Sequence, residues 1–487
     1  MSMLKKALLA LGLLLVVLVG IVTFRTYTVF TEQQVQVEPI TSAFSRDKNA
    51  AVQRLSRAIQ YQTISSEESS DSNSEFESFI RFLEKSYPSL WQKFPPEFIS
   101  EYSFLFRIKG TQSSTKPLMF LAHTDVVPVD AETLHKWRQA PFGGDIADGK
   151  VWGRGAIDDK GSVMALLEVA EYLVANNKLP ERDIYLAFGH DEEIGGKSGA
   201  AKIAEKLKSE GLEFEFILDE GGVITQGIMP GIQQPLALIG IAEKGFANFK
   251  LTVESTGGHS SQPPTNTAAG IIAQAVVKVE NAPFPADLSF MNQTFEKIGN
   301  YADISMRLPF SNLWLLQPVI ESAMNASPAT SASIRTTAAV TQLKGSSKSN
   351  ILPTEASAVV NFRLFPGTSV QDVKAHLKKI INDERVKIEP FMATEASSVS
   401  AADSASFELL EQTIRSIDGN ILVAPYLVIA GTDAKHYEGL SENIYRFMMV
   451  KFTPESLQRI HGINEHIDID EYHQIMTFYH ALMTQPF

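Results

Sequence analysis

Four acidic clusters in the sequence carry residue types that could hold a cation or move a proton. They lie in HTD (123–125), GRGAIDDKG (153–161), DEE (191–193) and LDEGG (218–222). Packing like charges in a partly desolvated site is costly, so such clusters persist where a cation or a proton transfer needs them. Each cluster also has an ordinary structural explanation: a satisfied core histidine, a helix N-cap, a solvated turn or a helix-start carboxylate. Four clusters in strand order favour one shared site.

The spacing inside two of these clusters indicates how the side chains are presented. Side chains alternate along a strand, so His123 and Asp125 share a face, and Asp125 can orient a ligating imidazole as its hydrogen-bond acceptor. The glycines before Asp158 let the backbone turn tightly ahead of the helical pattern SVMALLEVAEYL. This turn would deliver Asp158 into the same cleft.

Composition narrows the kinds of ligand. The chain has 487 residues, 44% of them hydrophobic, which is enough for a large core and for two domains. With 43 basic and 56 acidic residues the net charge is −13, which argues against a nucleic-acid partner and favours small-molecule substrates. The chain has no cysteine, so disulfides and thiolate metal sites are excluded. A metal would have to be held by His, Asp and Glu.

The N-terminus predicts a membrane helix within residues 1–30. Lys5 and Lys6 precede an uncharged apolar run, residues 7–24, that is long enough to cross a hydrocarbon core, and Arg25 closes it. Because no clear cleavage site follows, an uncleaved signal anchor is favoured over a removed signal peptide. The positive-inside tendency then places the globular part on the extracytoplasmic side, periplasmic or lumenal and extracellular. Residues 31–48 are polar and indicate a linker.

The remaining chain predicts an α/β fold with an inserted domain. Short apolar runs such as PLMFLAHTD and DIYLAFGHDEE alternate with helical patterns, which is typical of a sheet covered by helices on both faces. In such sheets the ligand site lies at the carboxyl ends of the strands. We expect this catalytic domain to comprise residues 49–245 and 393–487. Residues 246–392 indicate an inserted β-α-β-β-α-β domain, inside which the stretch 281–333 is not placed.

The order of the motifs resembles a known family. HTDVVP, GRGAIDDKG, DEEIGG, LDEGG, GGHSS, GTDAKH and HGINEH occur as in the dinuclear zinc family of aminoacylase, acetylornithine deacetylase, succinyl-diaminopimelate desuccinylase, glutamate carboxypeptidase and carboxypeptidase S. The resemblance runs from about residue 49 to the end and includes the inserted domain as a lid. The GHDEE form and the long lid are most similar to carboxypeptidase S and to enzymes that cleave N-fatty-acyl amino acids.

This resemblance implies two zinc ions per chain. His123 and Asp219 would bind one ion, Glu193 and His461 would bind the other, and Asp158 would bridge both. Three carboxylates, two Zn²⁺ and one hydroxide form a neutral set, which a desolvated site favours. Family members also have a cis peptide bond after the bridging aspartate, so we expect one here.

The resemblance also assigns the chemistry around the metals. Glu192 would be the general base that takes a proton from the attacking water and passes it to the leaving nitrogen. His259 would stabilise the tetrahedral oxyanion, often from a partner subunit, although a surface-loop histidine is the alternative. Arg363 would bind the free carboxylate of the substrate, and a solvated strand arginine is the alternative. Two further positions would complete that carboxylate pocket, Asn350 and Gly431.

The function that these inferences favour is a membrane-anchored dizinc hydrolase. It would cut the amide bond of an N-acyl amino acid or the C-terminal bond of a small peptide, and it could form a homodimer through the lid. A dipeptidase or aminopeptidase of the same chemistry is the alternative, as is the reverse reaction, which joins a fatty acid to an amino acid. A non-catalytic receptor module is disfavoured because Glu192 and every proposed ligand are present.

Overall fold

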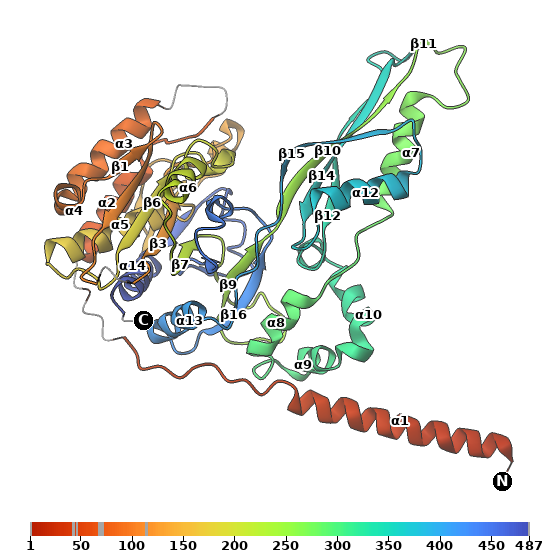
Figure 1. Cartoon of the computed structure of the whole chain (residues 1–487), viewed down its shortest axis with the longest axis horizontal. Coiled ribbons are helices and arrows are strands. Elements are labelled where there is room, and N and C mark those ends of the chain that lie inside the picture. Colours follow the sequence, from red (N-terminus) through yellow and green to blue (C-terminus); the bar gives the residue numbers. More distant parts are fainter. Residues whose placement is uncertain (1, 41–43, 45–46, 67–72, 113–114, 486–487) are drawn as a thin grey trace.

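The computed structural model describes residues 2–40, 44, 47–66, 73–112 and 115–485. A large mixed sheet with helices on both faces forms one part, and a narrower four-stranded sheet extends away from it (Figure 1). A long N-terminal helix lies below both parts in this view.

The large sheet has ten strands among the described residues, in the order β1-β2-β6-β3-β7-β17-β9-β8-β18, with β16 also pairing with β9. Strands β6, β3, β7 and β17 are parallel neighbours, and β2 and β9 flank them in the antiparallel sense. Strands β3 and β6 are buried along their full length, as their unbroken apolar runs indicate. The strand bounds are β1 (Glu97–Ile99), β2 (Ser103–Ile108), β3 (Leu118–His123), β6 (Ile184–Gly189), β7 (Phe216–Asp219), β8 (Ile224–Thr225), β9 (Leu236–Glu243), β16 (Leu422–Val428), β17 (Ile444–Arg446) and β18 (Lys451–Phe452).

Helices cover both faces of this sheet and bury its apolar side chains. One face packs against a layer centred on α5, and the other against α6 and the short helix η3. The bounds are α2 (Lys48–Ile59), α3 (Asn73–Ser86), α4 (Pro88–Lys93), α5 (Lys160–Ala175), α6 (Ala200–Ser209), α13 (Ala405–Ile417), α14 (Ile469–Thr484), η1 (Ala131–Lys136), η2 (Glu192–Ile194) and η3 (Asp433–Tyr437). A small sheet, β19-β5-β4, lies beside them, with bounds β4 (Ile146–Ala147), β5 (Lys150–Trp152) and β19 (His466–Asp468). The predicted α/β fold is confirmed.

The chain between β9 and β16 forms an inserted unit with its own antiparallel sheet, β12-β14-β10-β15, and its own hydrophobic core. Its elements are β10 (Gly245–Glu254), α7 (Ala268–Glu280), β12 (Thr337–Lys344), β14 (Glu355–Leu364), α12 (Val370–Ile381) and β15 (Lys387–Thr394). Two short strands, β11 (Gly258–His259) and β13 (Ile351–Leu352), pair at the end farthest from the large sheet (Figure 1).

The stretch 281–333, which the sequence left unplaced, forms four short helices within the described residues. They are α8 (Ser289–Ile298), α9 (Ile304–Ser311), α10 (Leu313–Met324) and α11 (Pro328–Ala332). Helix α8 packs on β16, and Phe295 of α8 stacks on Phe310 of α9 with ring centroids 3.7 Å apart. These helices therefore fill the junction between the large sheet and the inserted unit.

Helix α1 (Met3–Thr28) has the length and composition of a membrane span, with a mean hydropathy of 2.9 over a window that is 0% buried. It is the one such helix among the described residues. The segment after it, which the sequence indicated as a linker, makes buried contacts where it is described. Gln34 is buried, donates to the carbonyl of Val423 (3.0 Å) and accepts from its N–H (2.7 Å). Part of the predicted linker, 41–43 and 45–46, lies outside the described residues.

Candidate metal centre

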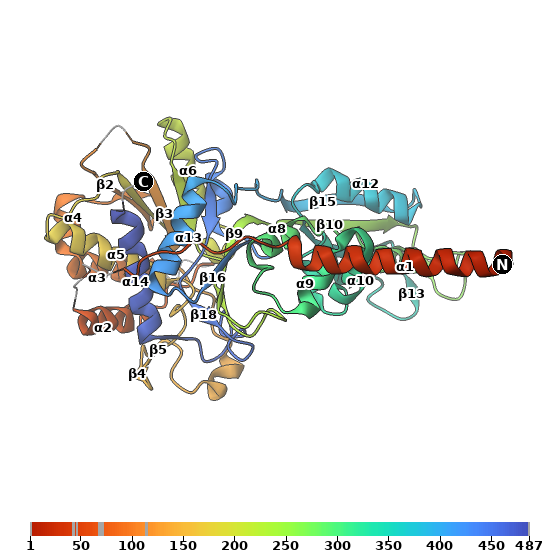
Figure 2. The ribbon, with the colours of Figure 1, turned by 90° about the horizontal axis from the view of Figure 1, so that it is seen from below.

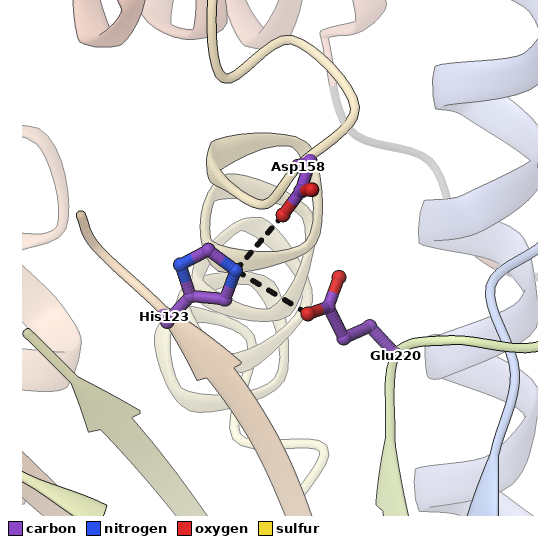
Figure 3. Close-up of side chains that lie close together, drawn as sticks. All are labelled: His123, Asp158 and Glu220. Atoms are coloured by element: carbon purple, nitrogen blue, oxygen red, sulfur yellow. Dashed lines mark hydrogen bonds and ion pairs between the residues drawn. The ribbon is translucent and has the colours of Figure 1, made fainter. Parts of the chain in front are cut away.

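The side chains of His123, Asp158 and Glu220 converge (Figure 3). They come from the end of β3, from the loop that precedes α5 and from the residue after β7. The Nε2 atom of His123 lies 2.9 Å from Oδ1 of Asp158 and 3.3 Å from Oε1 of Glu220. One donor atom from each of the three lies within 4.8 Å of the others, which is the spacing of ligands around one metal ion. The peptide bond between Asp158 and Asp159 is cis, so that prediction is confirmed.

A second group shares Asp158 with the first. Its other oxygen, Oδ2, lies 3.0 Å from Nε2 of His461, and this nitrogen lies 3.2 Å from Oε2 of Glu193. The remaining Glu193 oxygen is buried and has no hydrogen-bond partner among the described residues. An orphaned buried carboxylate oxygen is costly unless a cation coordinates it. The donors, two imidazoles and three carboxylates, are of the types that bind divalent metal ions such as zinc, and Asp158 belongs to both groups.

The electrostatics of the two groups also fit a cation. Burial opposes ionisation of Asp158, but the imidazoles of His123 and His461 lower its pKa below the usual value. In turn, hydrogen bonds to Asp158 and Glu193 raise the pKa of His461 to about 10. Burial, reinforced by Asp158, raises the pKa of the Glu220 carboxyl. Asp158 and Glu193 therefore hold a proton on His461, at a position that a bound divalent ion would take over.

Asp125 connects the first group to the DEE segment. One of its oxygens lies 3.2 Å from Nδ1 of His123 and accepts the N–H of Glu192 at 3.2 Å. The other accepts the N–H of Glu193 at 3.1 Å and the hydroxyl of Ser65 at 2.6 Å. A buried carboxylate in this position fixes the ring orientation of His123 and the course of the loop that carries Glu192 and Glu193.

A buried ion pair that the sequence analysis missed ties the bridging loop to the loop of His461. Arg154 donates to Glu465 at 2.6 Å and to the carbonyl of His461 at 3.1 Å. Glu465 also accepts the N–H groups of Ile157 and Asp158 at 3.0 and 3.3 Å. Their sequence positions could have indicated this pair, because Arg154 lies four residues before Asp158 and Glu465 lies four residues after His461.

The resemblance implied Asp219 as a ligand of the first ion, but the structure groups Glu220 with His123 and Asp158. Asp219 does not join the first group, because its two oxygens accept the N–H groups of Glu220 (2.9 Å) and Ala434 (2.7 Å). The next residue, Glu220, leaves the end of β7 and extends its longer side chain to His123. The sequence alone did not show which carboxylate of the pair Asp219–Glu220 would accept hydrogen bonds from backbone N–H groups.

Glu192 lies beside both groups without belonging to either. It begins η2, is partly buried, and its pKa is raised well above the usual value by burial and by the carboxylates of Asp433 and Glu220. Asp433, another residue that the sequence analysis missed, is buried in η3 and has one oxygen without a hydrogen-bond partner among the described residues. A carboxyl group with a raised pKa can exchange a proton near neutral pH.

The remaining predicted residues lie in two other places. His259 and Asn350 come together at the far tip of the inserted unit, where the N–H of Ser260 donates to the carbonyl of Asn350 at 3.2 Å (Figure 1). The metal groups of the same chain lie in the large sheet, so the structure does not bring His259 or Asn350 to them.

Arg363 lies at the near end of the inserted unit, and Gly431 lies on the loop that follows β16. Arg363 pairs in register with Phe246 at the start of β10, is exposed, and forms no ion pair with any described residue. Gly431 is exposed on the loop whose next residue, Thr432, donates to Glu243 at the end of β9.

Comparison with known proteins identifies relatives over nearly the whole chain. Residues 119–485 match the model of peptidase family M20/M25/M40. Probable carboxypeptidase S-like 2 of Dictyostelium discoideum is 41% identical over 465 residues, covering 93% of this chain and 89% of the relative. The N-fatty-acyl-amino acid synthase/hydrolase PM20D1 of Xenopus tropicalis is 37% identical over 479 residues, covering 96% of this chain and 93% of the relative.

Solved structures share the fold. The M20 family metallo-carboxypeptidase Sso-CP2 of Sulfolobus solfataricus has a TM-score of 0.64 at 18% identity, covering 89% of this chain and 98% of that chain. The Bacillus subtilis YXEP protein, a dinuclear metal binding peptidase, has a TM-score of 0.55 at 12% identity, covering 90% of this chain and 98% of that chain.

The assignment of Glu220 rather than Asp219 can be tested by metal content. We expect Glu220→Gln to lose about one zinc equivalent per chain on dialysis, because a neutral amide is a much weaker zinc ligand than a carboxylate. The matched variant Asp219→Asn should retain the zinc content of the parent protein. Inductively coupled plasma mass spectrometry measures both, and zinc loss confined to Asp219→Asn would contradict the assignment.

Proposed function

Because the chain belongs to peptidase family M20/M25/M40, we propose that it hydrolyses the amide bond of N-acyl amino acids or of small peptides with a free C-terminal carboxylate. The observation that carries this proposal is a glutamate outside both groups, Glu192, which precedes Glu193 and lies beside two groups that share Asp158. This arrangement suits hydrolysis by a metal-activated water and a carboxylate base.

The proposed metal sites follow from the two groups. His123 and Glu220 would hold one Zn²⁺, Glu193 and His461 the second, and Asp158 would contribute one oxygen to each. When bound, zinc lowers the pKa of a coordinated water and polarises the scissile carbonyl. The dinuclear metal binding relative from Bacillus subtilis supports two ions rather than one.

Glu192 would take the proton from the attacking water on a carboxylate oxygen and pass it to the leaving nitrogen. Burial raises the pKa of Glu192, and a carboxyl group with a raised pKa is a better proton acceptor than an ordinary carboxylate. Asp125 would hold the Glu192 backbone in place through the N–H bond at 3.2 Å. Glu192 is thereby positioned independently of the metals.

Recognition of the substrate carboxylate would fall to Arg363. It is exposed and free of ion pairs among the described residues, so its forked donors can bind a carboxylate in two places. Exposed Gly431, on the loop beside the metal groups, would offer backbone contacts to the same carboxylate.

His259 and Asn350 would act in a second copy of the chain. Both lie at the exposed tip of the inserted unit, remote from the metal groups of their own chain (Figure 1). In a homodimer formed through the inserted units, His259 of one chain could donate to the oxyanion formed in the other.

We also propose that α1 stays attached and anchors the catalytic part on the extracytoplasmic side of a membrane. Its last turns are specifically docked: Asn312 donates to the carbonyl of Val22 (3.3 Å) and the hydroxyl of Thr26 (3.2 Å), and Arg25 donates to the carbonyl of Ser311 (3.0 Å). Removal of α1 would leave the buried Asn312 without these partners, which supports an uncleaved helix.

The reverse reaction is the second candidate, because the Xenopus relative is described as both synthase and hydrolase. Joining a fatty acid to an amino acid would use the same proton transfers of Glu192 in the opposite order. Incubating the enzyme with high concentrations of both reactants and measuring the amide formed would reveal it.

The substrate class can be tested with matched substrates. We expect zinc-loaded enzyme to hydrolyse N-acyl amino acids of varied chain length, and to lose at least tenfold in kcat/KM when the substrate carboxylate is converted to an amide, because Arg363 would then lose a charged partner. Free-amine dipeptides are the control. Turnover confined to those dipeptides would identify a dipeptidase or aminopeptidase instead.

The role of Glu192 predicts a variant that binds metal but does not turn over. We expect Glu192→Gln to lower kcat by about 10³-fold, in the range typical of a missing general base, because an amide cannot accept the proton. Zinc content should stay at the parental level because Glu192 belongs to neither group. Normal hydrolysis by this variant would show that another group is the base.

Sharing of sites between two chains predicts complementation. Glu192→Gln and His259→Ala should each be inactive alone, but random mixing of both chains should restore about a quarter of parental activity, because half of the dimers are mixed and each has one intact site. Mixing requires dissociation and reassociation, monitored by fluorescence energy transfer between labelled chains. Chains that exchange without regaining activity would exclude a shared site.

A further inference from the structure

Helices α9 and α10 carry an apolar face that remains exposed. Ile304 and Leu308 lie one turn apart on α9, and Leu315 and Val319 lie one turn apart on α10, so each pair shares a face. We call this surface, together with Trp314, the α9–α10 platform. The exposed fractions are 52% for Ile304, 37% for Leu308, 56% for Trp314, 39% for Leu315 and 62% for Val319.

The platform is almost free of charge. Between Ile304 and Ile320 the sequence contains one charged residue, Arg307. Its guanidinium is turned inward, where it donates to the carbonyls of Gly299 and Asn300. A soluble surface of two adjacent helices would ordinarily carry several charges, so this one is suited to an apolar or interfacial environment.

The platform is continuous with the end of α1. Ser311 and Asn312, at the junction of α9 and α10, contact the last two turns of α1 through Val22, Arg25 and Thr26. Figures 1 and 2 both show α9 beside the C-terminal end of this helix. The contact is therefore at the depth where a membrane-spanning helix passes from hydrocarbon into the headgroup layer.

We propose that the α9–α10 platform is immersed in the interface of the membrane that α1 spans. This inference rests on the proposed membrane anchoring and extends it from one helix to the inserted unit. Trp314 and the exposed Tyr27 of α1 are residue types that favour the headgroup level. A lipid surface is the occupant that fits, because the platform adjoins a helix that itself requires lipid along its exposed apolar length.

This placement has a consequence for substrates. The inserted unit carries Arg363 and the tip residue His259, so a platform in the interface holds the substrate-binding unit against the lipid. N-acyl amino acids with long chains are amphiphiles that partition into the same layer. The enzyme would therefore meet them at the membrane surface rather than in bulk water.

The test uses the full chain in phosphatidylcholine vesicles and exploits the absence of cysteine. Single variants Val319→Cys on the platform, Leu11→Cys on α1 and Leu343→Cys on β12 each receive one nitroxide label. Leu343 is the matched control, because it is as exposed as Val319, at 62%, and lies in the same inserted unit. Power saturation then compares relaxation by oxygen, which concentrates in lipid, with relaxation by water-soluble chromium oxalate.

We expect the ratio of oxygen to chromium accessibility to be severalfold higher at 319 than at 343, and highest at 11. A label at 319 that matches 343, while 11 is protected, would overturn the platform but leave the anchor intact. Labels at both 11 and 319 that are open to chromium oxalate would overturn the anchor and the platform together. Spin–spin broadening at 319 would show that a second copy, rather than lipid, covers the surface.

Discussion

The structure depends on the convergence of carboxylates at the carboxyl ends of the parallel strands in the large mixed sheet. Within a few ångströms of Asp158 lie Glu193 and Glu220, and Glu192 stands beside them. In a desolvated site such a set is stable only if positive charge compensates it. Two imidazoles supply part of this charge, and divalent ions suit the rest. The sheet, the loops and the buried pair Arg154–Glu465 serve to hold this arrangement in place.

The hydrogen bonds of Asp125 and Glu465 explain how the loops of the site are held in fixed positions. Asp125 joins the end of β3 to the segment of Glu192 and Glu193, and Glu465 joins the bridging loop to the C-terminal region. Each is a buried carboxylate that accepts backbone N–H groups from a different motif. Motifs distant in sequence are thereby fixed relative to one another before any metal binds, and such preorganisation lowers the cost of binding.

The α/β fold and the strand-end placement of acidic clusters could be predicted because they follow from local patterns. The cis bond could be predicted only through the family resemblance that the motifs carry. The choice between Asp219 and Glu220 could not be predicted, because it depends on which carboxylate accepts the N–H of Ala434. Ala434 is distant from both residues in sequence. The positions of His259 and Asn350 depend on how far the inserted sheet extends, which periodicity does not reveal. The docked segment around Gln34 was also missed, because a single buried glutamine that pairs with Val423 leaves no periodic pattern.

The same charge balance links metal binding to protons. Without a cation, Asp158 and Glu193 keep His461 protonated, with a pKa of about 10, and burial keeps protons on Glu220. A metal that occupies these positions must displace those protons, so its affinity rises as the pH rises through the neutral range. Glu192 differs because it contributes no ligand atom to either metal group. In the proposed mechanism, its proton would exchange with substrate and water while the ligands stay on the metal, and this separation of roles would let adjacent glutamates serve binding and catalysis.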